Sequence, residues 1–170
     1  MDTFFEQIIA VKKTGKEIAA ISGIWLLAFV LCFLAVMFIK YISSLAFLLI
    51  AGILFGAFKL CVRFNIEYEY IVTNGTMDID KIISKSSRKR IVSFELSTVS
   101  SIEKFNPALL ARANQKDVLT ACNVTDPNAY IMAFSTEGKG TKHLVFSPDE
   151  RVKGAIIKFV PKFIANSAFK

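Results

Sequence analysis

The sequence predicts an α+β membrane protein in which two transmembrane helices precede a domain built mainly from strands. Three observations lead to this fold class: a charge-poor stretch over residues 18–62, alternating apolar residues after Arg63, and one amphipathic stripe near the C-terminus. Residues 18–62 hold two charges, whereas residues 63–170 hold 16 Lys or Arg and 11 Asp or Glu. The average composition therefore combines an apolar segment, residues 18–62, with a segment as charged as an ordinary soluble domain, residues 63–170.

Two apolar runs fill the charge-poor stretch. Residues 18–39 carry no charge, and residues 41–62 carry only Lys59. A helix needs about 20 apolar residues to cross the hydrocarbon core, and only Lys40 separates the runs, so they predict a transmembrane hairpin over 18–62. A cleaved signal peptide fits poorly, because its apolar region is usually ~7–15 residues long. A soluble core fits poorly too, because a chain this short cannot cover both runs.

Basic residues set the predicted orientation. They cluster before the first run (Lys12, Lys13 and Lys16) and after the second (Lys59 and Arg63), and the turn holds only Lys40. Loops rich in Lys and Arg stay on the cytoplasmic side. We therefore expect a plasma-membrane protein with both termini in the cytoplasm.

The first 17 residues predict an amphipathic helix. Thr3 and Glu6 have the spacing of a capping box, and one side carries Phe4, Phe5, Ile8 and Ile9. With Lys12, Lys13 and Lys16 at its end, such a helix suits the membrane interface and anionic headgroups. A helix packed on the globular domain is an equal alternative.

Small residues within the apolar runs indicate where helices approach each other. Gly23 lies four residues after Ala19, and Gly52 and Gly56 form a GxxxG pair. Glycines at this spacing allow close backbone contact. We expect Gly23, Gly52 and Gly56 to pack within the hairpin, with homodimerisation through Gly52 and Gly56 as the alternative.

Strand patterns dominate the chain after Arg63. Apolar and aromatic residues alternate over 66–73, and Asn74-Gly75 is the strongest short signal for a two-residue hairpin turn. Turn formers separate further runs, predicting a loop with a helical turn over 106–116, a turn over 137–140, and strands at 76–82, 88–95, 98–104, 117–124, 129–136 and 141–146. These make seven antiparallel strands.

A helix follows the last strand. Ser147, Pro148 and Glu150 suit the N-cap, N1 and N3 positions, and apolar residues recur at helical spacing over 152–163 until Pro161 ends or kinks the helix. Seven strands and a final helix predict a partly open antiparallel barrel, capped by the helix, over residues 63–170.

This order of elements resembles the pleckstrin-homology-like (PH-like) superfold, and specifically the bacterial PH-like domains found next to transmembrane hairpins. Residues 69–75, Glu-Tyr-Ile-Val-Thr-Asn-Gly, are similar to their first strand and turn. Residues 88–102 are similar to their basic strand and the entry to the next one. The resemblance implies a cytoplasmic PH-like domain, and it leaves the function open because this fold hosts many roles.

The sequence shows no catalytic or metal-binding constellation. His143 is the single histidine, and no HExxH, CxxC, P-loop or helix-opening GxGxxG motif occurs. Cys32, Cys61 and Cys122 have no metal-ligand spacing and are too few and too scattered for a disulfide framework. We therefore predict a protein that is not an enzyme and uses no cofactor or metal.

The basic cluster in residues 85–90 is the main candidate site. Lys85, Arg88, Lys89 and Arg90 lie close together in sequence, and Arg88 and Arg90 share one face of a strand. The charges could protect an edge strand, or could bind anionic lipid together with Lys12, Lys13 and Lys16. The favoured prediction is an interaction or scaffold module that binds a protein partner or itself at the bilayer. The alternative is an anionic-lipid sensor, and nucleic acid is not an expected partner.

Overall fold

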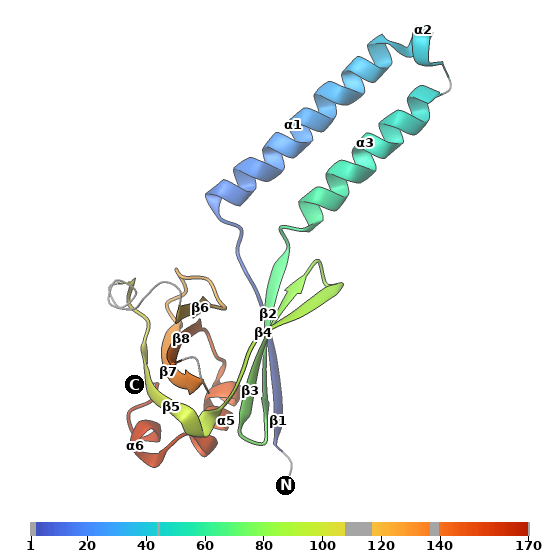
Figure 1. The fold of residues 1–170 in the computed structure, drawn as a ribbon. Coiled ribbons are helices and arrows are strands. Elements are labelled where there is room, and N and C mark those ends of the chain that lie inside the picture. Colours follow the sequence, from blue (N-terminus) through green and yellow to red (C-terminus); the bar gives the residue numbers. More distant parts are fainter. Residues whose placement is uncertain (1–2, 44, 108–116, 137–139, 170) are drawn as a thin grey trace. The chain divides into compact units, whose positions relative to one another are not determined.

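The computed structural model describes residues 3–43, 45–107, 117–136 and 140–169, and the chain divides into two compact units. One unit is Lys12–Ile66. The other joins Met1–Val11 to Glu67–Lys170 (Figure 1). The domain predicted over 63–170 therefore also contains the first residues of the chain, and the hairpin interrupts it.

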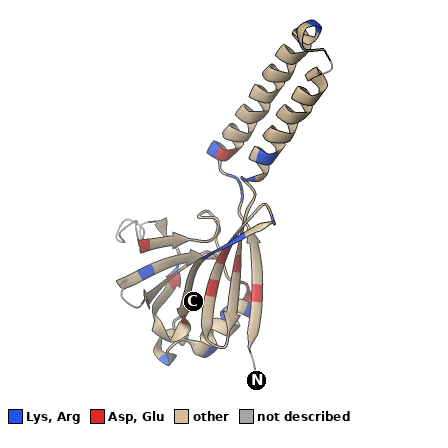
Figure 2. Cartoon of the chain, turned by 45° about the vertical axis from the view of Figure 1, so that its right-hand side comes forward, with Lys and Arg blue, Asp and Glu red and all other residues tan. Residues whose placement is uncertain are grey.

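The unit Lys12–Ile66 is a helical hairpin. Helix α1 (Gly15–Met37) packs along α3 (Leu45–Val62), and the short α2 (Ile39–Ile42) occupies the turn predicted around Lys40. Both long helices are long and apolar enough to cross a membrane, and 11% of the most apolar window of each is buried. Charged residues lie only near the ends of the hairpin (Figure 2). The sequence thus placed the two helices well.

Alanines rather than glycines make the close contacts within the hairpin. The buried residues of the two long helices are Ala28, Ala35, Ala46 and Ala57. A Cβ atom added at Gly23, Gly52 or Gly56 would meet no atom within 4 Å. These glycines thus have open space around them, and both their predicted packing within the hairpin and dimerisation through Gly52 and Gly56 remain predictions.

The N-terminal segment is a strand, so the predicted amphipathic helix over residues 1–17 is wrong. Strand β1 (Phe4–Ala10) pairs antiparallel with β2 (Ile66–Thr73), from Phe4 opposite Thr73 to Ala10 opposite Glu67. The apolar doublets at 4–5 and 8–9 suit a helix face but also serve the two faces of a strand. Pairing with β2 decides between them, since a short isolated helix is only marginally stable. The capping box occurs instead at Thr14 and Glu17, where α1 begins.

Sheet A contains four strands in the order β1-β2-β3-β4, with β3 at Thr76–Ile83 and β4 at Ser87–Glu95. Asn74 and Gly75 both have positive φ, 48° and 91°, as a type I′ turn requires. The predicted hairpin is therefore confirmed. A single 3-10 turn, Leu96–Thr98, then leads the chain from β4 into the second sheet.

Sheet B contains β5 (Val99–Lys104), β6 (Val118–Thr120), β7 (Tyr130–Thr136) and β8 (Gly140–Phe146), in the order β5-β7-β8-β6. Strand β6 is shorter than predicted and runs parallel to β8. The seven-stranded antiparallel barrel is therefore wrong: the described strands form two four-stranded sheets. Most of the loop predicted over 106–116 and the turn over 137–140 lie outside the described residues.

Two C-terminal helices pack on the core. Helix α5 (Glu150–Phe159) begins after Asp149, whose side chain accepts a hydrogen bond from the Val152 amide, so the predicted N-cap at Ser147 is two residues too early. As predicted, Pro161 ends this helix, and the short α6 (Lys162–Ala165) follows it. The core lies between the sheets and α5, where the stacked rings of Phe94 and Phe134 lie 3.8 Å apart.

Candidate functional site

A β-bulge turns the basic strand toward a set of carboxylates. Val92 and Phe94 of β4 face the core, so strict alternation would also place Arg88 and Arg90 on that side. The register with β3 shifts between Ile79 and Asp80, so that Asp80 lies opposite Arg90. The bulge reverses the alternation, and both arginines reach the outer face of sheet A.

Both arginines are held in ion pairs on this outer face. Arg90 contacts two carboxylates of β3, with its Nη1 3.0 Å from Asp78 Oδ2 and its Nε 2.9 Å from Asp80 Oδ1. Arg88 Nη2 lies 3.0 Å from Oε1 of Glu69 on β2. The arginine side chains remain about half exposed, whereas the side chains of Glu69 and Asp80 are buried. Two of the four basic residues in the cluster over 85–90 are therefore already ion-paired within the domain.

The buried Glu69 carboxyl is crowded by other acids. Burial raises its pKa, a hydrogen bond with Glu6 of β1 raises it further, and Arg88 lowers it. Oε2 of Glu69 otherwise has no hydrogen-bond partner among the described residues. A hydrogen bond between two carboxyl groups needs a proton on one of them. The face thus holds more negative charge than its arginines compensate.

The two predicted lysines of the cluster differ from the arginines in their surroundings. Lys85 sits in the β3–β4 turn with φ 57°, and both Lys85 and Lys89 are exposed. The turn borders a shallow groove of about 480 Å³, lined by Ile8, Glu67, Ile82, Lys85, Ser86, Ser87 and Arg88. Lys85 is therefore at the end of sheet A where β1 ends and β2 begins. The other predicted lipid contacts, Lys12, Lys13 and Lys16, belong to the helical unit and are exposed there.

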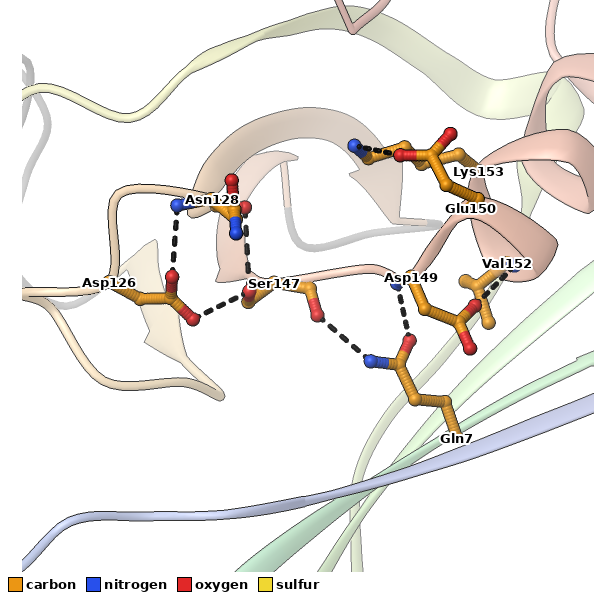
Figure 3. Close-up of polar contacts among 8 residues, drawn as sticks. All are labelled: Gln7, Asp126, Asn128, Ser147, Asp149, Glu150, Val152 and Lys153. Carbon is orange, nitrogen blue, oxygen red and sulfur yellow. Dashed lines mark hydrogen bonds and ion pairs between the residues drawn. The ribbon is translucent and has the colours of Figure 1, made fainter.

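A polar network fixes β1 to the rest of the domain (Figure 3). The Gln7 side chain donates to the Ser147 carbonyl at 3.2 Å and accepts from the Asp149 amide at 2.8 Å. The Ser147 hydroxyl in turn donates to Asp126 Oδ2 at 2.7 Å. The Gln7 side chain thus bonds both a carbonyl and an amide of the segment before α5. Glu6 and Ile8 lie on the opposite face of β1.

Tyr70 connects the same segment to the core. Its hydroxyl donates to the Ala121 carbonyl at 2.6 Å and accepts from the Ser147 amide at 3.1 Å. Burial raises the pKa of this tyrosine, so its proton stays in place. Sequence reasoning missed Gln7, Tyr70 and Ser147 as a group. The available signal was a polar Gln7 on the same side of β1 as Phe5 and Ile9.

The chain as a whole matches a family model described as a bacterial PH-like domain, DUF6106, over residues 1–166. The chain belongs to this bacterial PH-like family. The matched region begins before β1 and runs through both apolar helices, so the interrupted PH-like domain and its hairpin are covered together. No curated protein and no solved structure matches the chain. The family match confirms the resemblance to bacterial PH-like domains that the sequence indicated.

The family places limits on the chemistry to expect. PH-like domains are generally non-enzymatic and commonly bind lipids or proteins. Within the described part of the chain, no group of three or more His, Cys, Asp or Glu side chains could hold a metal ion. Cys122 is buried, and burial raises the pKa of its thiol to about 12, so it remains an unreactive thiol at neutral pH.

Proposed function

We propose that this protein is a membrane-anchored, non-catalytic interaction module that displays a PH-like domain at the cytoplasmic face of the plasma membrane. The main support is the way the helical hairpin enters the domain. Ala10, the last residue of β1, lies opposite Glu67 near the start of β2, so the chain leaves and re-enters sheet A through adjacent strands. Residues 11–14 and 63–65 connect sheet A to the two long helices.

Two short connectors restrict the domain more than one flexible tether would. A residue adds at most about 3.5 Å of chain, so four residues reach no more than about 14 Å. Both connectors are basic, through Lys12, Lys13 and Arg63, which favours their cytoplasmic location. An anchor of this kind suits a module that presents a defined face to a partner.

Cysteine labelling tests the anchoring and the orientation. In a chain with Cys32, Cys61 and Cys122 replaced by alanine, Ser43→Cys lies between the helices and Ser97→Cys lies in the domain. In intact bacterial spheroplasts, we expect a membrane-impermeant maleimide to label Cys at 43 and to label Cys at 97 only after lysis. The reverse pattern would overturn the orientation, and release of the chain by alkaline carbonate would overturn the membrane anchor.

Contact with anionic lipid is a second candidate function, favoured by the position of the β3–β4 turn. Lys85 lies at the end of sheet A that carries both connectors, whereas Ser97 follows the opposite end, where the Leu96 amide bonds the Gly75 carbonyl. Each basic residue near anionic headgroups contributes ~1 kcal/mol of attraction. Arg88 and Arg90 are already ion-paired, so the attraction to lipid would come from Lys85, Lys89 and the basic connectors.

An environment-sensitive dye distinguishes this second candidate from a pure protein-binding role. On Ser86→Cys of the full chain in nanodiscs, we expect a blue shift with anionic but not neutral lipid, lost at about 0.5 M salt because the Debye length falls well below 10 Å. The Lys85→Ala/Lys89→Ala variant should lose the shift. The same dye on Ser97→Cys is the control. Equal spectra in both lipids at low salt would rule out lipid contact by this turn.

A further inference from the structure

Strand β1 is an edge of sheet A, and it lacks the features that protect the other described edges. Edge strands usually avoid unwanted pairing through charges, bulges or short length. Strand β4 carries three successive basic residues and a bulge, β5 carries Glu103, Lys104 and a bulge, and β6 has three residues. Strand β1 is seven residues long, pairs with β2 without a register shift, and carries one charge, Glu6.

The side chains of β1 divide sharply between its two faces. Phe5, Gln7 and Ile9 are half-buried against the domain. On the outer face, Phe4 and Ile8 are 61% and 52% exposed, and Glu6 is exposed between them. Among the described strands, β1 pairs only with β2, so its other side offers backbone N–H and C=O groups for a further strand.

The charge on this face indicates what an added strand should carry. Glu6 shares a hydrogen bond with the buried Glu69, and β1 and β2 contain no basic residue. Arg88, a cation on this face, already pairs with Glu69. A basic side chain opposite Glu6 would therefore meet uncompensated negative charge, and apolar side chains two residues away on either side would cover Phe4 and Ile8.

We propose that β1 is a docking edge for an extended segment of a partner protein with the pattern apolar–x–basic–x–apolar. The segment adds a fifth strand to sheet A through main-chain hydrogen bonds, which supply affinity, while its alternate side chains supply specificity. This inference rests on the proposed function, because it names the surface and the partner chemistry of the interaction module.

The test uses the full chain in nanodiscs of neutral phosphatidylcholine, which keeps lipid charge out of the measurement. The probe is a labelled, capped heptapeptide, Thr-Val-Thr-Lys-Thr-Val-Thr, followed by fluorescence anisotropy. We expect saturable binding that Glu6→Lys weakens about tenfold, because an attractive cross-strand pair becomes a repulsive one. Glu103→Lys makes the same charge change on β5 and should alter binding less than about twofold.

Two changes to the peptide test whether binding depends on the charge of Glu6 and on main-chain hydrogen bonds. Replacing the peptide lysine with glutamate should weaken binding to the natural chain and restore it for the Glu6→Lys chain. Methylating alternate backbone nitrogens of the peptide, which removes ladder donors, should abolish binding. No saturable binding, an equal loss with Glu103→Lys, or no rescue by the swap would each overturn the docking edge. Membrane orientation does not enter this assay, so its failure is separable from failure of the cysteine-labelling test.

Discussion

A chain that begins at Glu67 is expected to be about 3–5 kcal/mol less stable than the same domain with β1 restored. The comparison chain replaces residues 12–66 with a short glycine-rich hairpin linker, which is feasible because Ala10 and Glu67 are opposite each other. Loss of β1 removes the half-buried Phe5 and Ile9, the two Gln7 hydrogen bonds and one ladder of sheet A. A loss of this size approaches the whole stability of a small domain. Urea unfolding followed by far-ultraviolet circular dichroism measures it.

Gln7→Ala in the linked chain is the matched control for this deletion. It keeps the strand but removes both side-chain bonds to Ser147 and Asp149, so it should cost about 1–3 kcal/mol, a part of the full effect. Equal stability of the chains with and without β1 would mean that residues 67–170 form a complete domain. The interrupted-domain description would then be wrong.

Tyr70→Phe is expected to destabilise the linked domain by about 1–3 kcal/mol. The substitution keeps the ring, which contacts Phe146 edge-on, and removes only the hydroxyl. The Ala121 carbonyl and the Ser147 amide then lose their partner in a fully buried place, and a buried unsatisfied polar group is costly. Urea unfolding midpoints at neutral pH give the difference in the free energy of unfolding.

Ser97→Ala supplies the comparison for Tyr70→Phe. Its hydroxyl bonds Glu95 at an exposed position, so its loss should change stability by less than about 0.5 kcal/mol. If Tyr70→Phe is equally mild, the hydroxyl does not hold the segment before α5 to the core. The network around Ser147 would then depend on Gln7, Asp126 and Asn128.

Local signals predicted much of the fold. The apolar runs predicted both long helices, because the length of an uninterrupted apolar run is visible in the sequence. Asn74-Gly75 predicted the hairpin turn, because these residue types readily adopt the positive φ that the turn requires. The assignment of β1 failed because its apolar doublets fit two periodicities, and a strand 56 residues later in the chain decides between them. Strand β1 ends at Ala10, and β2 begins at Ile66.

The candidate site was less predictable than the fold for the same reason. Lys85, Arg88, Lys89 and Arg90 were visible as a cluster. The neutralisation of Arg88 and Arg90 depends on carboxylates from two other strands and on a bulge at Ile79 and Asp80. No local sequence pattern in β4 predicts that bulge. The unprotected edge of β1 could be recognised only once β1 was known to be a strand.

The hairpin lies between β1 and β2 in the chain, so the proposed membrane anchoring would link folding of sheet A to membrane insertion. During synthesis β1 emerges first, yet its pairing partner emerges only after both apolar helices. If α1 crossed the bilayer and α3 did not cross back, β1 and β2 would lie on opposite sides of the membrane and could not pair in sheet A. With the proposed anchoring, sheet A therefore forms only in a chain that has crossed the bilayer twice, and a chain that crosses once leaves β1 and β2 unpaired.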